Sequence, residues 1–228
     1  MRMARILSFL IPNPDESRDL AARLREEHPG LTPEQIAHKT VASAKRMAAG
    51  TGALMGLAGS PVTWIPAAAA DAAAVLKIEG RMAGTIAALL DPDILDDPQQ
   101  FQADVIAVVF PGVASQALRV AGMRTGMSIS RRLIRSQSAE RLIEAVLRHG
   151  GRWLGVRYAR KAVISKGIPL IGAGIGSGWN WLEVHAVGQR AVSYYMHRPI
   201  APAIGGGTPT PWTRVRQLLR LTSGSNPD

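Results

Sequence analysis

Two long uncharged stretches rich in glycine and alanine constrain this fold more than any other feature of the chain. Residues 48–70 have the sequence AAGTGALMGLAGSPVTWIPAAAA, and residues 167–182 have the sequence GIPLIGAGIGSGWNWL. Small residues recur at a spacing of four in both stretches, which places them on one side of a helix and lets another backbone approach closely. We therefore expect the two stretches to pack together at the centre of the fold. The residues expected at this contact are Gly52, Gly56, Gly172 and Gly176.

The composition favours helices over strands. Apolar residues make up 46% of the 228 residues, which is enough for a sizeable core, although aromatic residues make up only 5%. Alanine is the best helix former, and few segments alternate between apolar and polar residues as a half-buried strand would. The sequence therefore predicts an all-α fold, a compact multi-helix bundle with glycine-rich central helices and a flexible basic C-terminal tail.

Capping signals and prolines predict where the helices begin and end. A charged helix is expected over residues 15–27, with Asp15 as its N-cap or first-turn acid. Thr32 and Gln35 have the spacing of a capping box, and Pro33 fits the first position of the helix that follows. That helix is expected to run to about Met47, where the glycine-rich stretch begins.

Further along the chain, prolines and acidic residues again mark the expected boundaries. A long helix is expected from Pro66 to about Leu90, and another is expected to start around Asp97. The last long helix is expected from Pro169 to about Tyr195. These boundaries predict an N-terminal arm (1–14), one helical domain (15–198) and a Gly/Pro-rich linker with a short basic amphipathic tail (199–228).

Positive charge is concentrated in one part of the chain, which we call the basic segment (residues 119–166). It contains twelve Lys or Arg residues against Glu140 and Glu144, whereas the rest of the chain has fifteen basic and fifteen acidic residues. Such a segment suits an anionic surface, since guanidinium binds phosphate through two parallel hydrogen bonds. The residues expected to contact that surface are Arg119, Arg124, Arg131, Arg132, Arg135, Arg148, Arg152, Arg157, Arg160 and Lys161.

The uncharged stretches leave three arrangements open. A membrane-spanning helix needs about 20 apolar residues. Gly59, Ser60, Pro61 and Pro66 interrupt the first stretch, and the second has only 16 uncharged residues before Glu183. A buried helical pair is favoured over a peripheral or re-entrant membrane element, and true spanning is the least favoured.

Two blocks of the sequence resemble the EcsC protein family. The first block begins a helix at Pro66 and continues with an aspartate, a Glu-x-x-Met pattern and an Ile-Ala pair before an acidic turn. The second block has an Ile-Pro start, a glycine-rich run, an asparagine and an arginine-containing helix that ends in an aromatic residue. The matching positions are Pro66, Asp71, Glu79, Met82, Ile86 and Ala87, and then Ile168, Pro169, Gly172, Gly176, Asn180, Arg190 and Tyr195.

The resemblance covers roughly residues 29–197 and departs from the family pattern at one place. Leu89 and Leu90 stand where the family usually has Tyr-Gly before the acidic turn. The resemblance implies an α-helical protein that is cytoplasmic or membrane-associated. The family takes its name from a companion of an ABC transporter and has no settled activity, so the resemblance implies no catalytic residues.

One polar cluster is expected inside the apolar body. Asp71 extends an apolar helix face, and a buried carboxylate must be hydrogen-bonded, paired or protonated. Arg190 is a candidate partner, with Asn180 as a nearby amide. The cluster could bind a small polar ligand in a helical crevice, but a polar contact that fixes the helix register is favoured.

No reaction motif is present in the sequence. The five histidines form no i, i+4 pair, and neither a Walker loop nor a GxSxG nor a dinucleotide fingerprint occurs. We therefore expect no metal site, no cofactor and no catalytic residues. An enzyme remains an alternative, for which the plausible titratable groups are Asp71, Glu79, Asp104 and Glu183.

The sequence thus favours a non-enzymatic helical protein of the cytoplasm. It would be peripherally associated with the inner face of the membrane through the basic segment, as an accessory to a transporter. The expected partner is an anionic membrane surface or lipid. Nucleic acid is less favoured, because no recognition motif occurs and few aromatic residues alternate with the arginines. The alternative is a small-molecule or lipid-binding carrier with a crevice between the glycine-rich helices. The sequence predicts no oligomeric state.

Overall fold

The computed structural model describes residues 12–56, 61–112, 114 and 169–196, and these residues are almost entirely helical. No strand occurs in these ranges, so the all-α prediction is confirmed for the described part of the chain. The expected N-terminal arm up to residue 11, the basic segment and the C-terminal tail lie outside the described residues. The elements are α2 (Pro14–Glu27), α3 (Pro33–Gly56), α4 (Pro61–Leu90), η1 (Pro92–Asp96), α5 (Pro98–Val109) and α9 (Pro169–Tyr195).

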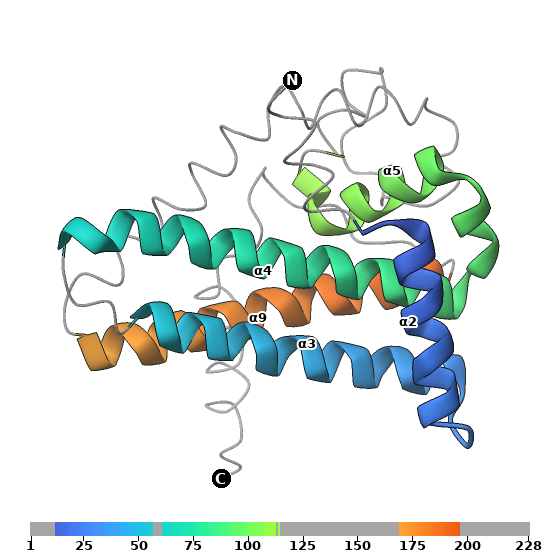
Figure 1. Ribbon diagram of the computed structural model, residues 1–228, viewed down its shortest axis with the longest axis horizontal. Coiled ribbons are helices and arrows are strands. Elements are labelled where there is room, and N and C mark those ends of the chain that lie inside the picture. The colour runs from blue at the N-terminus through green and yellow to red at the C-terminus, as the bar shows by residue number, and fades with distance from the viewer. Residues whose placement is uncertain (1–11, 57–60, 113, 115–168, 197–228) are drawn as a thin grey trace, which may run out of the picture.

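Three long helices, α3, α4 and α9, contact one another along their lengths and form the body of the fold (Figure 1). Helices α4 and α9 run in the same direction, and α3 runs in the opposite direction. Helix α2 crosses the body near the end of α4, and α5 packs against the same end of α4 and against α9. The glycine-rich parts of α3 and α9, which are far apart in the sequence, are thereby neighbours.

Side chains cap the starts of three helices. The Thr32 N–H donates to Gln35 Oε1 at 2.9 Å and the Gln35 N–H donates to Thr32 Oγ1 at 3.3 Å, so the predicted capping box is confirmed. Asp97 caps α5 by accepting from the Gln100 N–H at 3.0 Å. At α2 the cap is Asn13, whose side chain accepts from the Asp15 N–H, and Asp15 is a first-turn acid.

Two helices are longer than the sequence predicts. Helix α3 continues past Met47 to Gly56, because packing against α9 offsets the low helix propensity of its glycines. Helix α4 begins at Pro61, five residues before Pro66. A proline at the first position needs no hydrogen-bond partner for its nitrogen, and Pro66 costs the helix one backbone hydrogen bond.

The core is built mainly from alanine, valine, isoleucine and leucine. On α4, Val75, Met82, Ile86 and Leu89 are buried and Ile78 is partly buried, so these residues at a spacing of three or four form one apolar face. Every residue of α4 from 82 to 89 is buried, since α2, α3, α5 and α9 surround this part of the helix. No helix within the described ranges is both long enough and apolar enough to cross a bilayer.

Candidate functional site

A polar contact between α4 and α9 lies inside the apolar body. Asn180 Nδ2 donates to Asp71 Oδ1 at 3.0 Å and to the carbonyl oxygen of Ala48 on α3, also at 3.0 Å. Asp71 and Asn180 are each only 1% exposed. One amide group therefore connects all three long helices at a single level, which fixes their register.

The closest approach of α3 and α9 lies one helical turn from that contact. A Cβ atom on Gly52 would lie 2.5 Å from the Gly176 carbonyl oxygen and 2.7 Å from Asn180 Nδ2, and one on Gly176 would lie 2.9 Å from the Gly52 oxygen. Only glycine leaves room for two backbones at this distance. Gly174 and Gly178 have open space around them. Gly56 and Gly172 belong to α3 and α9, but their surroundings are outside the description.

Arg190 lies away from Asp71. Its Nε donates to the carbonyl oxygen of Val108 at 3.1 Å, which connects α9 to α5. Arg190 is ten residues after Asn180, which is about 15 Å along a helix. The structure therefore gives Asp71 the amide of Asn180 as a hydrogen-bond donor, and Arg190 stabilises a different helix contact.

A second buried carboxylate lies between α5 and α9. Asp104 is fully buried, and its Oδ1 accepts from Tyr194 Oη at 2.9 Å and from Gln100 Nε2 at 2.6 Å. Sequence reasoning treated Asp104 only as a titratable group and missed this contact. The i, i+4 spacing of Gln100 and Asp104 on one helix was the available signal.

Two of the four carboxylates considered for an enzyme, Asp71 and Asp104, lie apart from each other. Asp71 and Glu79 are on α4, Asp104 is on α5 and Glu183 is on α9. The α9 partners of Asp71 and Asp104 are fourteen residues apart, or about 21 Å along the helix. Asp71 and Asp104 therefore bind different polar groups at different levels of the bundle.

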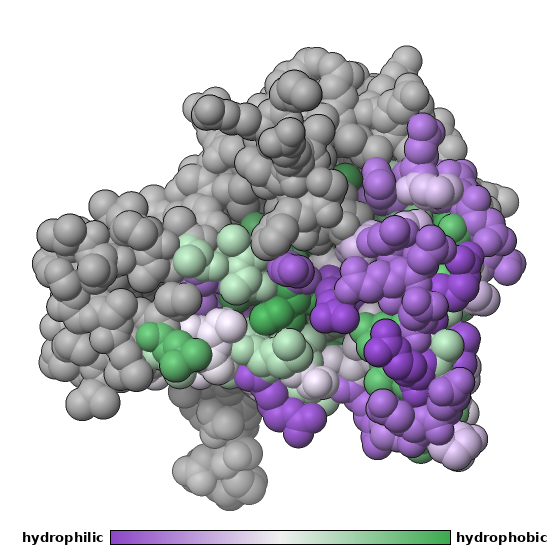
Figure 2. Space-filling view, viewed as in Figure 1, coloured by the Kyte–Doolittle hydropathy of each residue, from purple (hydrophilic) through white to green (hydrophobic). Residues whose placement is uncertain are grey.

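A cavity of about 770 Å³ opens on another face, between α2, α3 and α4. Its apolar lining includes Leu20, Leu24, Ala44, Met47, Ile78 and Met82. In Figure 2, apolar surface over α3 and α4 is bordered by hydrophilic side chains on this face. Sequence reasoning missed this cavity, because its walls come from three helices whose crossing no single motif encodes.

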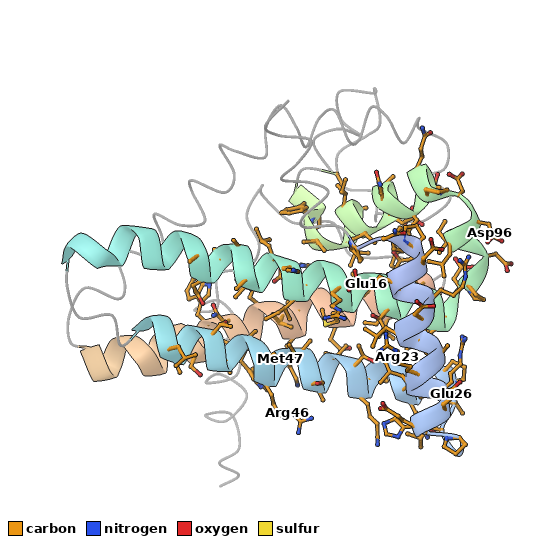
Figure 3. All side chains as sticks on the ribbon, viewed as in Figure 1. Glu16, Arg23, Glu26, Arg46, Met47 and Asp96 are labelled. Atoms are coloured by element: carbon orange, nitrogen blue, oxygen red, sulfur yellow. The ribbon has the colours of Figure 1, made fainter. Side chains whose placement is uncertain are left out.

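Basic side chains from two helices line the same cavity. Lys39 and Arg46 come from α3, and Lys77 and Arg81 come from α4. Figure 3 shows Arg46 extending outward from α3, next to Met47. The lining also contains one acid, Glu27, and Arg81 has Glu16 as an ion-pair partner at 3.2 Å with both side chains half-exposed.

The ten residues expected to contact an anionic surface, from Arg119 to Lys161, lie outside the described residues. Within the described ranges, no group of three or more histidine and acidic side chains could hold a metal ion. The chain matches no protein-family model, no curated protein and no solved structure.

Proposed function

We propose that this chain is a non-enzymatic helical protein of the cytoplasm that docks peripherally on an anionic membrane surface. The basic segment would make the contact, through arginines such as Arg131, Arg132 and Arg135. The observation that carries the proposal is the charge distribution along the chain. Twelve basic residues stand against two acidic ones in 48 residues, and the remaining 180 residues are balanced.

The energetics of such docking are favourable. Each Lys or Arg near an anionic bilayer contributes about 1 kcal/mol, so six of the twelve facing the membrane would contribute about 6 kcal/mol before entropic costs. This attraction is screened within a Debye length of about 8 Å at physiological salt. Binding by this route must therefore weaken as the salt concentration rises.

The resemblance to the EcsC family supports a place beside a membrane transporter. In this proposal the helical body is a rigid platform, and the basic segment provides the attraction to lipid phosphates.

Co-sedimentation with lipid vesicles tests the proposal. The full chain is mixed with vesicles of phosphatidylcholine alone, or with one third phosphatidylserine, over a series of salt concentrations. Binding to the anionic vesicles that falls with salt is expected, with little binding to the neutral ones. Binding that is absent, or equal on both vesicles, would contradict electrostatic docking.

A matched pair of variants locates the contact. Replacing Arg131 and Arg132 by glutamine removes two charges from the basic segment and is expected to weaken vesicle binding by about 2 kcal/mol, or about thirtyfold. Replacing Arg18 and Arg23 by glutamine removes the same charge from α2 and should change binding much less. Equal losses of vesicle binding in the two variants would show that binding depends on the net charge of the chain and not on the basic segment.

The carrier alternative placed a crevice between the glycine-rich helices. At the level of Gly52 and Gly176 the two backbones are too close for even a methyl group between them. The geometry therefore favours a structural role for Asp71, Asn180 and these two glycines.

A further inference from the structure

The cavity between α2, α3 and α4 has a largely apolar interior, in which two threonine hydroxyls donate to carbonyl groups of their own helices. Thr40 Oγ1 donates to the Ile36 carbonyl at 3.0 Å, and Thr85 Oγ1 donates to the Arg81 carbonyl at 2.8 Å, both within their own helices. The least exposed lining side chains are Thr85 at 0%, Met82 at 3% and Ala44 at 6%, and the Thr85 hydroxyl is already used within α4. A ligand inside the cavity would therefore contact hydrocarbon and methionine sulfur, and methionine adapts well to flexible chains.

The charged groups around this interior have a positive balance. Lys39, Arg46, Lys77 and Arg81 provide four positive charges, and Glu27 together with the ion-pair partner Glu16 provides two negative charges. Lys39 and Arg46 are both exposed and are seven residues apart, so they share one face of α3. A ligand with a negatively charged head would be attracted to these side chains.

The size and the lining narrow the ligand class. A volume of about 770 Å³ lies within the roughly 300–1,000 Å³ range typical of small-molecule sites. Among the described lining residues there is no Phe, Tyr or Trp, and the imidazole of His28 is the aromatic ring present, so a flat nucleobase would have little aromatic surface on which to stack. An unbranched acyl chain needs only aliphatic contact, and it leaves its head at the open side.

We propose that this cavity binds one molecule of an anionic lipid with a single acyl chain. The chain would lie against Met47, Ile78 and Met82, and the phosphate or carboxylate head would lie at Lys39 and Arg46. The proposal uses no residue of the basic segment and does not depend on membrane docking. Failure of vesicle binding would leave it intact, because the test below contains no membrane.

Isothermal titration with lipid monomers tests the proposal on the full chain. The probes are 1-oleoyl lysophosphatidic acid, 1-oleoyl lysophosphatidylcholine and glycerol 3-phosphate, each below its critical micelle concentration where it has one. We expect 1:1 binding of the lysophosphatidic acid, weaker binding of the zwitterionic lipid and no binding of glycerol 3-phosphate. Equal binding of the two lipids would refute the role of the charged residues, and binding of glycerol 3-phosphate alone would refute the role of the apolar interior.

Two neighbouring residues on α3 provide a matched control for charge. Arg46 lines the cavity, whereas Lys45 lies over the Trp181 ring on the α9 side, 4.4 Å from its centroid. Arg46→Ala is expected to weaken lysophosphatidic acid binding about fivefold, and Lys45→Ala should change it less than about twofold. The same loss in both variants would show that the lipid responds to overall charge, and it would overturn the site.

A variant that fills the cavity tests its apolar interior. Ala74→Trp places a large ring among the lining residues of α4 and should abolish binding. If circular dichroism shows that the first variant is unfolded, Ser43→Trp, at an exposed lining position of α3, serves the same purpose. Undiminished binding in a folded variant of either kind would overturn the proposal.

Discussion

The two sides of α3 use the same helix in opposite ways. Toward α9, Gly52 meets Gly176 with no space for a Cβ atom, and Val41 fills the space over Gly188, where an added Cβ would lie 2.6 Å from its methyl groups. Toward α2 and α4, Ser43 and Met47 line an open cavity, and Met47 is 57% exposed. One side of the helix is closed by backbone contact, and the other is left accessible.

The difference lies in residue size as much as in hydrophobicity. Glycines on both helices let α3 and α9 approach until main-chain atoms touch, and Asn180 then satisfies buried polar groups on two helices. On the open side, long side chains such as Lys39 and Arg46 are among the residues that line the cavity. The close contact with α9 makes α3 rigid, and α3 in turn forms one wall of the cavity. A binding site is held more precisely when its wall is rigid.

The largest effect is expected from breaking the polar contact on the closed side. Asn180→Leu leaves the buried Asp71 without its amide donor, and the free energy of unfolding should fall by about 3 kcal/mol. Chemical denaturation followed by circular dichroism measures this. Gln189→Leu, at an exposed position of the same helix, is the control and should change stability by less than about 0.5 kcal/mol.

The next largest effect on stability is expected at Gly52, and Gly50 on the same helix is its control. Gly52→Ala forces the α3 and α9 backbones apart and should destabilise the protein by about 1–2 kcal/mol, despite a gain in helix propensity. Gly50→Ala adds the same methyl group where nothing lies within 4 Å, and it should stabilise the protein by up to about 1 kcal/mol. Thermal unfolding measures the change in melting temperature of each variant. Changes of the same sign in both variants would contradict the close contact of α3 and α9 at Gly52.

A smaller loss of stability is expected from a change at the N-terminal cap of α3, the helix that carries both the closed and the open side. Thr32→Ala removes the side-chain acceptor for the Gln35 N–H, and the cost should be about 1 kcal/mol. Urea denaturation measures this change. Lysophosphatidic acid binding should be unaltered, so a large loss of binding would mean that the cavity is sensitive to any loss of stability.

The smallest effect is expected on the open side. Ser43→Leu places a larger apolar side chain at an exposed cavity position, and stability should change by less than about 0.5 kcal/mol. Differential scanning calorimetry can detect the shift. A loss above about 2 kcal/mol would contradict an open wall, because it would indicate overpacking.

The sequence predicts the local features of the fold well. The capping box at Thr32, the start of α5 after Asp97 and the bounds of α9 all depend on neighbouring residues. The C-terminal end of α3 and the first residue of α4 differ from the prediction, because glycine and proline are weak signals when a neighbouring helix packs against them. Helix propensity describes only local residues, so it does not include the stabilisation that packing against another helix provides.

The sequence predicts Asp71 as a buried polar group but does not predict which side chain binds its carboxylate. Asn180 and Arg190 both lie on the same helix, and only the register between α4 and α9 decides which of them meets Asp71. The cavity was not predictable, since it depends on how α2 crosses α3 and α4. Long-range packing of this kind leaves no pattern in one stretch of sequence.

Thiol labelling tests the two-sided account of α3 most directly, because the chain contains no cysteine. Ser43→Cys lies on the cavity wall, and Val41→Cys replaces a side chain that is 2% exposed on the α9 side. We predict fast labelling of Ser43→Cys that slows when 1-oleoyl lysophosphatidic acid is added, and slow labelling of Val41→Cys with or without the lipid. Equal labelling rates at the two positions, or no protection of Ser43→Cys by the lipid, would contradict the account.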